Sequence, residues 1–184
     1  MTWTTTTHSP EETQAIAAAL GERLEGGDVV ALIGEMGAGK TTLVRGLARG
    51  LGADEEEVAS PTYTLMHEYP GRLVLRHFDA WMEEREEAFL LGGGAEWLHD
   101  PEGVCVLEWA GRVSGHLPAE HLQLELQPLD LERRELRLLV LGCGPRAERL
   151  QALLGELQEA FGGTPEKIPS RPEPEGPSTV EPDA

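Results

Sequence analysis

The stretch Gly34-Glu35-Met36-Gly37-Ala38-Gly39-Lys40-Thr41 matches the phosphate-binding pattern G-x-x-x-x-G-K-[ST] at every fixed position. Residues 29–33, directly before it, form a short apolar run rich in β-branched side chains, which predicts a buried strand. Residues 42–48, directly after it, predict a helix. A strand, a loop and a helix in this order direct backbone N–H groups and a helix N-terminus toward one point, where a polyphosphate fits. The stretch therefore predicts an anion site at the end of a buried strand.

Two side chains of this pattern carry its chemistry. Lys40 is one of only two lysines in a chain that otherwise uses arginine for positive charge, and we expect it to reach the β- and γ-phosphates of a nucleotide. The Thr41 hydroxyl is expected to bind Mg²⁺. The chain contains no asparagine, so the Asn-Lys-x-Asp motif for guanine is absent, which disfavours a GTPase. The residues themselves therefore predict a nucleotide polyphosphate bound together with Mg²⁺, with guanine disfavoured as its base.

The strand–loop–helix unit predicts the fold class. We expect an α/β domain of the P-loop NTPase type, with a mainly parallel sheet flanked by helices and with antiparallel edge strands. Residues 1–142 are expected to form the ATPase domain and 143–161 a C-terminal helical extension. Residues 162–184 are rich in Pro, Gly, Glu and Ser, which predicts a disordered acidic tail.

Capping and turn residues predict further elements. The sequence Ser9-Pro10-Glu11-Glu12 forms a capping box and predicts a helix that Gly26-Gly27 ends. The pair Pro70-Gly71 suits a tight turn, with proline and glycine at its two central positions, and predicts a β-hairpin. The expected helices are residues 83–91, 96–98 and 146–161, and the expected strands are 64–69, 73–78, 104–107, 122–126 and 136–141, the last two near a sheet edge.

The composition restricts the possible partners and compartments. The chain has 15 Lys and Arg against 33 Asp and Glu, a formal net charge of −18. Such a surface argues against direct binding to nucleic acid, because phosphate contacts require clustered Lys and Arg. No apolar run has the length of a membrane span, and the N-terminus lacks the features of a signal peptide. Cys105 and Cys143 have neither metal-site nor disulfide spacing. We expect a cytoplasmic protein with no membrane contact.

Two acids follow predicted buried strands and are candidates for the chemistry. Asp79 ends the strand 73–78, and Glu108 ends the strand 104–107. A nucleotide triphosphatase needs an acid at such a strand end to hold Mg²⁺ or to orient a water, although an ordinary polar strand end is the alternative for each. Thr62 and Thr64 lie in a loop that senses the γ-phosphate in many such folds. Turn chemistry around Pro61 explains them equally well.

These segments together resemble the TsaE family, the bacterial ATPases of tRNA threonylcarbamoyladenosine biosynthesis. The resemblance spans roughly residues 9 to 141, and its blocks lie in the family's order. The five blocks are Glu12-Thr13, Gly34-Glu35-Met36-Gly37-Ala38-Gly39-Lys40-Thr41-Thr42-Leu43, Ser60-Pro61-Thr62-Tyr63-Thr64-Leu65, His77-Phe78-Asp79 and Val106-Leu107-Glu108-Trp109.

The resemblance implies roles for individual residues. Asp79, Lys40 and Thr62 are implied as catalytic residues, with Asp79 holding a metal-bound water or positioning the attacking one. Residues 60–64 resemble a switch segment that responds to the nucleotide, and Thr13 would contact the nucleotide near its base. The implied ATP-binding set is Thr13, Gly37, Ala38, Gly39, Lys40, Thr41, Thr42 and Arg134, and the implied Mg²⁺ set is Thr41 and Glu108.

The chain departs from the family pattern beside the second acid block. The family usually continues His-x-Asp with Leu-Tyr-Arg, whereas this chain has Ala80-Trp81-Met82. In this chain the role of that arginine is taken by another residue, for which Arg85 is a candidate, or by no residue. Met36 replaces a common leucine, a swap of similar volume that we expect to be harmless.

The resemblance also implies a partner system. The family joins the TsaB and TsaD proteins and resets them between turnovers, while TsaD transfers the threonylcarbamoyl group to the adenosine beside the anticodon of tRNA. An acidic ATPase that meets tRNA only indirectly is compatible with this role. We expect slow ATP hydrolysis without partners, because the sequence has no obvious arginine finger.

Two other functions remain open at this stage. A small-molecule kinase would use the same loop to phosphorylate a metabolite, but an arginine-rich lid is absent from the sequence. A nucleotide-gated assembly factor would act through its bound state rather than through hydrolysis. Loss of the Asp79 carboxylate separates the second alternative from an ATPase.

Overall fold

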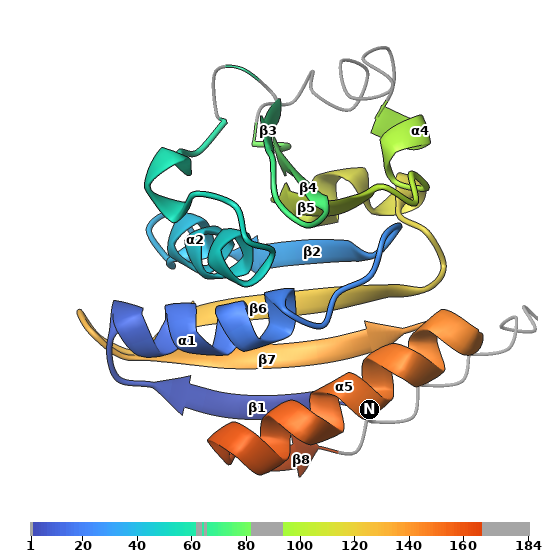
Figure 1. The fold of residues 1–184 in the computed structure, drawn as a ribbon. Helices are drawn as coiled ribbons and strands as arrows, with labels where there is room; N and C mark the ends of the chain where they lie inside the picture. The colour runs from blue at the N-terminus through green and yellow to red at the C-terminus, as the bar shows by residue number, and fades with distance from the viewer. Residues whose placement is uncertain (1, 62–63, 65, 82–93, 167–184) are drawn as a thin grey trace, which may run out of the picture.

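The computed structural model describes residues 2–61, 64, 66–81 and 94–166. In this part of the chain, eight strands form one sheet in the order β3-β4-β5-β2-β6-β7-β1-β8 (Figure 1). Strands β4, β5, β2 and β6 are parallel to one another, and antiparallel pairs continue the sheet on both sides. The predicted α/β fold with a parallel core and antiparallel edge strands is confirmed.

The strands are β1 (Thr2–Thr7), β2 (Val29–Gly34), β3 (Met66–Tyr69), β4 (Val74–Asp79), β5 (Gly103–Glu108), β6 (His121–Pro128), β7 (Arg134–Leu141) and β8 (Thr164–Glu166). The helices are α1 (Pro10–Gly21), α2 (Lys40–Gly50), α4 (Gly94–Trp97) and α5 (Pro145–Phe161), with 3₁₀ segments η1 (Glu55–Glu57) and η2 (Ala110–His116). None of the described helices is long and apolar enough to cross a bilayer.

The central strand β2 is buried on both faces, which explains its continuous apolar sequence. Val30 and Leu32 belong to the larger core cluster, which includes the inner faces of α1, α2 and α5. Val29 and Ala31 point to the opposite face, in a smaller cluster with residues of β4, β5 and η2. Helices α1, α2 and α5 therefore lie on one side of the sheet, as Figure 1 shows.

Helices α1 and α2 approach so closely that glycines are required where they meet, and Gly46 is one of them. A Cβ added to Gly46 of α2 would lie 2.5 Å from the Gln14 carbonyl oxygen and 2.7 Å from the Ala17 Cβ of α1. We expect Gly46→Ala to lower the free energy of unfolding by about 1–3 kcal/mol through overpacking. Urea denaturation followed by circular dichroism measures this change.

The matched control for that substitution is a helical glycine without close neighbours. Nothing lies within 4 Å of a Cβ added to Gly155 of α5. Gly155→Ala is expected to raise the free energy of unfolding by about 0.5–1 kcal/mol, because alanine favours the helix. Equal effects of the two substitutions would contradict the close packing at Gly46.

The end of α1 differs from the prediction. The Ser9 side chain caps the helix by accepting from the Glu12 N–H, as expected, but the helix ends at Gly21 rather than at Gly26-Gly27. The Arg72 guanidinium donates to the carbonyls of Gly21 and Leu24 at 2.6 and 2.7 Å. A side chain from the hairpin thus satisfies the carbonyls that end the helix, which the local sequence does not indicate.

The hairpin of β3 and β4 is confirmed, but its turn differs from the prediction. The register pairs Tyr69 with Leu75, so the connection is longer than the two central residues expected. Gly71 does not have the positive φ that glycine adopts at the second central position of a type II turn. Glycine is instead required because an added Cβ would collide with the Leu51 carbonyl oxygen.

The sheet extends further than the sequence predicts. Strands β6 and β7 lie inside the sheet rather than near its edge, because β1 pairs with β7 and β8 pairs with β1. The threonine-rich strand β1 was not among the expected elements, and residues 164–166 were assigned to a disordered tail. Trp3 of β1 is completely buried and its indole N–H donates to the Gly162 carbonyl at 2.7 Å, which anchors the start of that tail. The predicted helix 83–91 and residues 167–184 lie outside the described residues.

Candidate active site

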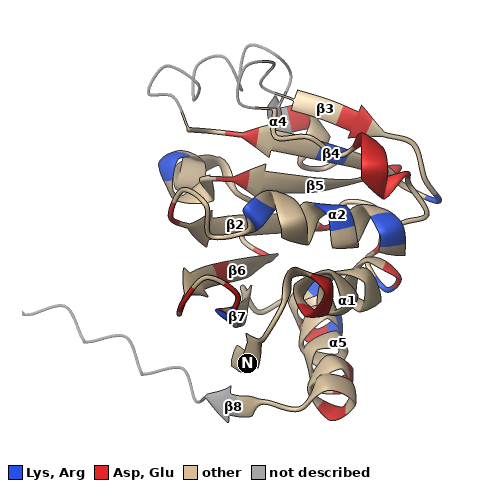
Figure 2. Cartoon of the chain, turned by 90° about the vertical axis from the view of Figure 1, so that its left-hand side faces the viewer, with Lys and Arg blue, Asp and Glu red and all other residues tan. Residues whose placement is uncertain are grey.

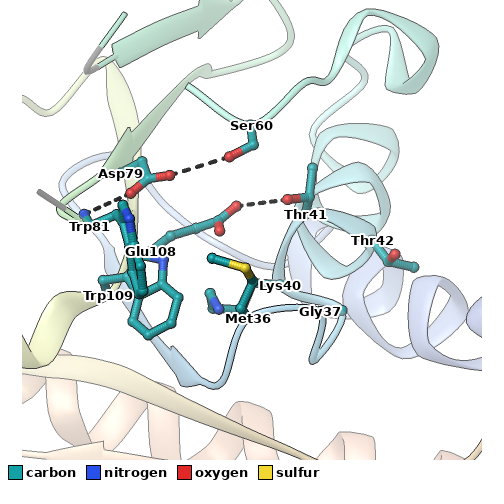
Figure 3. Close-up of a pocket in the computed structure, with 11 residues that line it drawn as sticks. Met36, Gly37, Lys40, Thr41, Thr42, Ser60, Asp79, Trp81, Glu108 and Trp109 are labelled. Carbon is teal, nitrogen blue, oxygen red and sulfur yellow. Dashed lines mark hydrogen bonds between the residues drawn. The ribbon is translucent and has the colours of Figure 1, made fainter. Parts of the chain in front are cut away.

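Four chain segments meet at the carboxyl ends of the parallel strands. They are the loop after β2 with the start of α2, the segment after η1, the end of β4 and the end of β5. They surround a pocket of about 350 Å³, shown in Figure 3. Its lining residues are Met36, Gly37, Gly39, Lys40, Thr41, Thr42, Ser60, Asp79, Trp81, Glu108 and Trp109.

The glycines of the loop adopt conformations that other residues avoid. Gly37 and Gly39 have φ angles of 77° and 105°, in the left-handed region that favours glycine. Gly39 is the N-cap of α2, and no side chain caps this helix. Because glycine has no side chain, the N-cap residue supplies no acceptor for the first N–H groups of α2, which suits a helix terminus that binds an anion.

The Lys40 ammonium is buried at the pocket and held in a fixed position. Its Nζ donates to the carbonyls of Gly34 and Glu35, both at 2.9 Å, and lies 3.9 Å from the centroid of the Trp109 ring. Burial lowers the Lys40 pKa, while the negative charges of Glu108 and Asp79 act in the opposite direction. The two carboxylates thus favour the charged form of Lys40, which burial disfavours.

The two candidate acids lie side by side. Asp79 and Glu108 are register partners at the ends of β4 and β5, and both side chains are buried. In Figure 2 acidic positions follow the ends of these two strands, next to the start of α2. Glu108 Oε1 accepts from the Thr41 hydroxyl at 3.0 Å. Asp79 accepts from the Ser60 hydroxyl at 3.2 Å and from the Trp81 N–H at 2.8 Å.

The oxygen donors of this pocket fit a magnesium ion bound together with phosphates. A hydroxyl from Thr41 and a carboxylate from Glu108 are hard ligands, and Mg²⁺ typically takes one or two carboxylates, several waters and substrate phosphates. The described residues contain no group of three or more His, Cys, Asp or Glu that could hold a metal by itself. A metal at Thr41 and Glu108 would accordingly depend on phosphate ligands.

The three remaining members of the predicted ATP-binding set, Thr13, Ala38 and Arg134, lie on another side of the phosphate loop. Thr13 and Arg134 line a small hollow of about 30 Å³ with Ala38, Gly39 and Thr42. Arg134 Nε donates to the Ala38 carbonyl at 3.0 Å, and the Thr13 hydroxyl exchanges a hydrogen bond with that of Thr7 at 2.8 Å. The loop therefore has a hollow on each side, with Gly39 and Thr42 lining both.

Other features of the site were not predicted from the sequence. Trp109 has φ 60° and ψ 31°, a left-handed conformation that is an outlier for a bulky residue. In this conformation the centroid of its ring lies 4.4 Å from that of the Trp81 ring, and the Lys40 ammonium lies over the Trp109 ring. The sequence signal was only that both tryptophans follow candidate acids. Thr62 and Arg85 lie outside the described residues.

Comparisons with known proteins agree on one family. A sequence model described as "Threonylcarbamoyl adenosine biosynthesis protein TsaE" matches residues 7–136. The tRNA threonylcarbamoyladenosine biosynthesis protein TsaE of Bacillus subtilis is 41% identical over 137 residues, covering 74% of this chain and 84% of that protein. The protein of the same description from Treponema pallidum is 41% identical over 128 residues, covering 70% and 93%.

A solved structure extends this similarity to the fold. The crystal structure of Bacillus subtilis YdiB superposes with a TM-score of 0.69 at 33% identity, covering 87% of this chain and 96% of that chain. The matched region contains the phosphate loop, both acids and Arg134. The chain therefore belongs to the TsaE family of threonylcarbamoyl adenosine biosynthesis proteins.

Proposed function

We propose that this protein is a Mg²⁺-dependent cytoplasmic ATPase that works with TsaB and TsaD to form the threonylcarbamoyl group on the tRNA adenosine beside the anticodon. One observation carries the ATPase part: Asp79 and Glu108, from neighbouring strands, face the uncapped start of α2 across a single pocket. The family membership supports the role in tRNA modification.

Four side chains of the pocket have defined tasks in this proposal. The N–H groups at the start of α2 and the Lys40 ammonium bind the phosphates, and Lys40 leaves its two backbone carbonyls to do so. Thr41 and Glu108 hold Mg²⁺, which when bound neutralises negative charge on the phosphate oxygens. Asp79 accepts a hydrogen bond from the attacking water and orients it, a task that suits a buried carboxylate. Hydrolysis thus depends on positioning and charge.

Partners are proposed to complete the site. Among the described residues that line the pocket, Lys40 is the only cation. Phosphoryl transfer in related enzymes gains much of its rate from a second cation, often an arginine supplied by a partner. TsaB and TsaD would supply it here, and tRNA would reach this acidic protein only through them.

Partner stimulation tests the proposal directly. ATP turnover by the purified chain is expected to be slow alone and to rise at least about tenfold with TsaB and TsaD, since a supplied arginine contributes about 10³–10⁵-fold in comparable enzymes. Phosphate release under multiple-turnover conditions measures both rates, and each partner alone serves as the control. Equal turnover with and without both partners would contradict the proposal.

A further inference from the structure

A buried histidine contacts the carboxylate that the proposed function assigns to the metal. His77 of β4 is completely buried, and its Nε2 lies 2.9 Å from Glu108 Oε1. The same oxygen accepts from the Thr41 hydroxyl at 3.0 Å. His77 precedes Asp79 by two residues, so both side chains leave β4 on the same face of the sheet.

The surroundings of the ring assign its tautomer. Among the described residues, His77 Nδ1 has no hydrogen-bond partner. A proton on Nδ1 would bury an unpaired N–H and would place two acceptors, Nε2 and the carboxylate oxygen, 2.9 Å apart. A proton on Nε2 avoids both costs. His77 therefore donates to Glu108 through Nε2.

Two donors on one oxygen fix the orientation of the carboxylate. With Oε1 held by His77 and Thr41, the second oxygen of Glu108 is left for a metal ion or its water. The negative charge of Glu108 also acts to raise the Lys40 pKa, so the ammonium attracts this carboxylate. Without the hydrogen bond from His77, the carboxylate would be free to turn toward that ammonium.

We propose that His77 is a positioning residue for the metal site, which holds Glu108 in the orientation that binds Mg²⁺ and away from Lys40. This inference rests on the proposed ATPase function. It differs from a general role in packing because it requires a hydrogen-bond donor at the position of Nε2, rather than only a side chain of similar volume. Partners that orient a metal ligand in this way typically contribute 10–100-fold to metal affinity.

Two substitutions at His77 separate these roles. His77→Leu removes the hydrogen-bond donor. His77→Gln retains a donor, because its amide nitrogen takes the position of Nε2. Mn²⁺ binding to the complex with ADP, followed by electron paramagnetic resonance, is expected to weaken by about 10–100-fold in His77→Leu and to stay within about threefold in His77→Gln. Binding of ADP in the presence of EDTA should be equal in all three proteins.

A second buried position on β4 provides the control for folding. Leu75 is completely buried two residues before His77, and Leu75→Ala is expected to lower thermal stability while leaving Mn²⁺ affinity unchanged. Equal metal affinity in wild type and His77→Leu, or equal weakening in His77→Leu and His77→Gln, would overturn the inference. A wild-type chain that binds neither ADP nor Mn²⁺–ADP would instead overturn the proposed function itself.

Discussion

Replacing Asp79 by asparagine is expected to lower kcat for ATP hydrolysis by about 10³-fold while leaving the affinity for ATP within about threefold. The amide has the shape of the carboxylate: its oxygen can still accept from the Trp81 N–H, and its NH₂ group can donate to the Ser60 hydroxyl oxygen, in place of the bond that the second carboxylate oxygen accepts. It cannot supply the negative charge that orients and polarises a water. The loss should therefore fall on the chemical step rather than on binding.

Single-turnover phosphate release and equilibrium binding of a fluorescent ATP analogue measure the two quantities separately. Asp100→Asn is the matched control, because this carboxylate pairs with Arg76 and is not among the residues that line the pocket. Its kcat should be unchanged. Unimpaired hydrolysis by Asp79→Asn would show that another group positions the water.

The same variant distinguishes an ATPase from a nucleotide-gated assembly factor. If hydrolysis is required, Asp79→Asn should bind the partners with ATP but fail to sustain repeated rounds of tRNA modification. If complex formation and tRNA modification both survive the loss of hydrolysis, the bound state alone performs the function. A reconstituted reaction with TsaB, TsaD and tRNA provides this measurement.

Replacing Lys40 by alanine is expected to weaken ATP binding by about 100-fold or more, because truncating one member of a buried charge pair typically costs 2–5 kcal/mol. The ammonium is already desolvated and fixed by two carbonyls and the Trp109 ring, so little ordering is needed when a phosphate replaces these contacts. Removing it also takes away positive charge that acts on Asp79 and Glu108, which disfavours a polyphosphate further.

Isothermal titration of ATP into each variant measures this loss. The chain contains a single other lysine, Lys167, so Lys167→Ala makes the same chemical change outside the phosphate loop and should leave the affinity unchanged. Lys40→Arg keeps the charge but changes the geometry of the donors, and we expect it to recover only part of the affinity. Wild-type affinity in Lys40→Ala would contradict a role in phosphate binding.

Local patterns in the sequence predicted the elements that surround the site. The apolar run before the loop, the glycines within it and the helix after it form β2, the phosphate loop and α2. The capping box at Ser9 begins α1, and Pro70-Gly71 connects the strands of a hairpin. Each of these features depends on residues close together in the chain, whose hydrogen bonds and backbone preferences operate over a few positions.

Longer-range contacts decided what these patterns missed. The Arg72 guanidinium satisfies the carbonyls of Gly21 and Leu24, at and just after the end of α1, and a threonine-rich segment becomes a strand because β7 and β8 pair with it. Neither contact is visible in the residues on either side. The left-handed conformation of Trp109 is similar, because no local preference favours it for tryptophan.

The sequence alone determined the class of site, because a phosphate loop is a set of backbone conformations that glycines and a lysine specify locally. The sequence named Asp79 and Glu108 only as separate candidates, and the tertiary structure decided that both line the same pocket. The parallel pairing of β4 with β5 brings Asp79 beside Glu108, and the neighbouring positions of β4 and β5 bring His77 to the carboxylate that Thr41 also contacts. Contacts across 31 and 67 residues of chain depend on strand order and register, which are set by burial of the whole sheet rather than by any single segment.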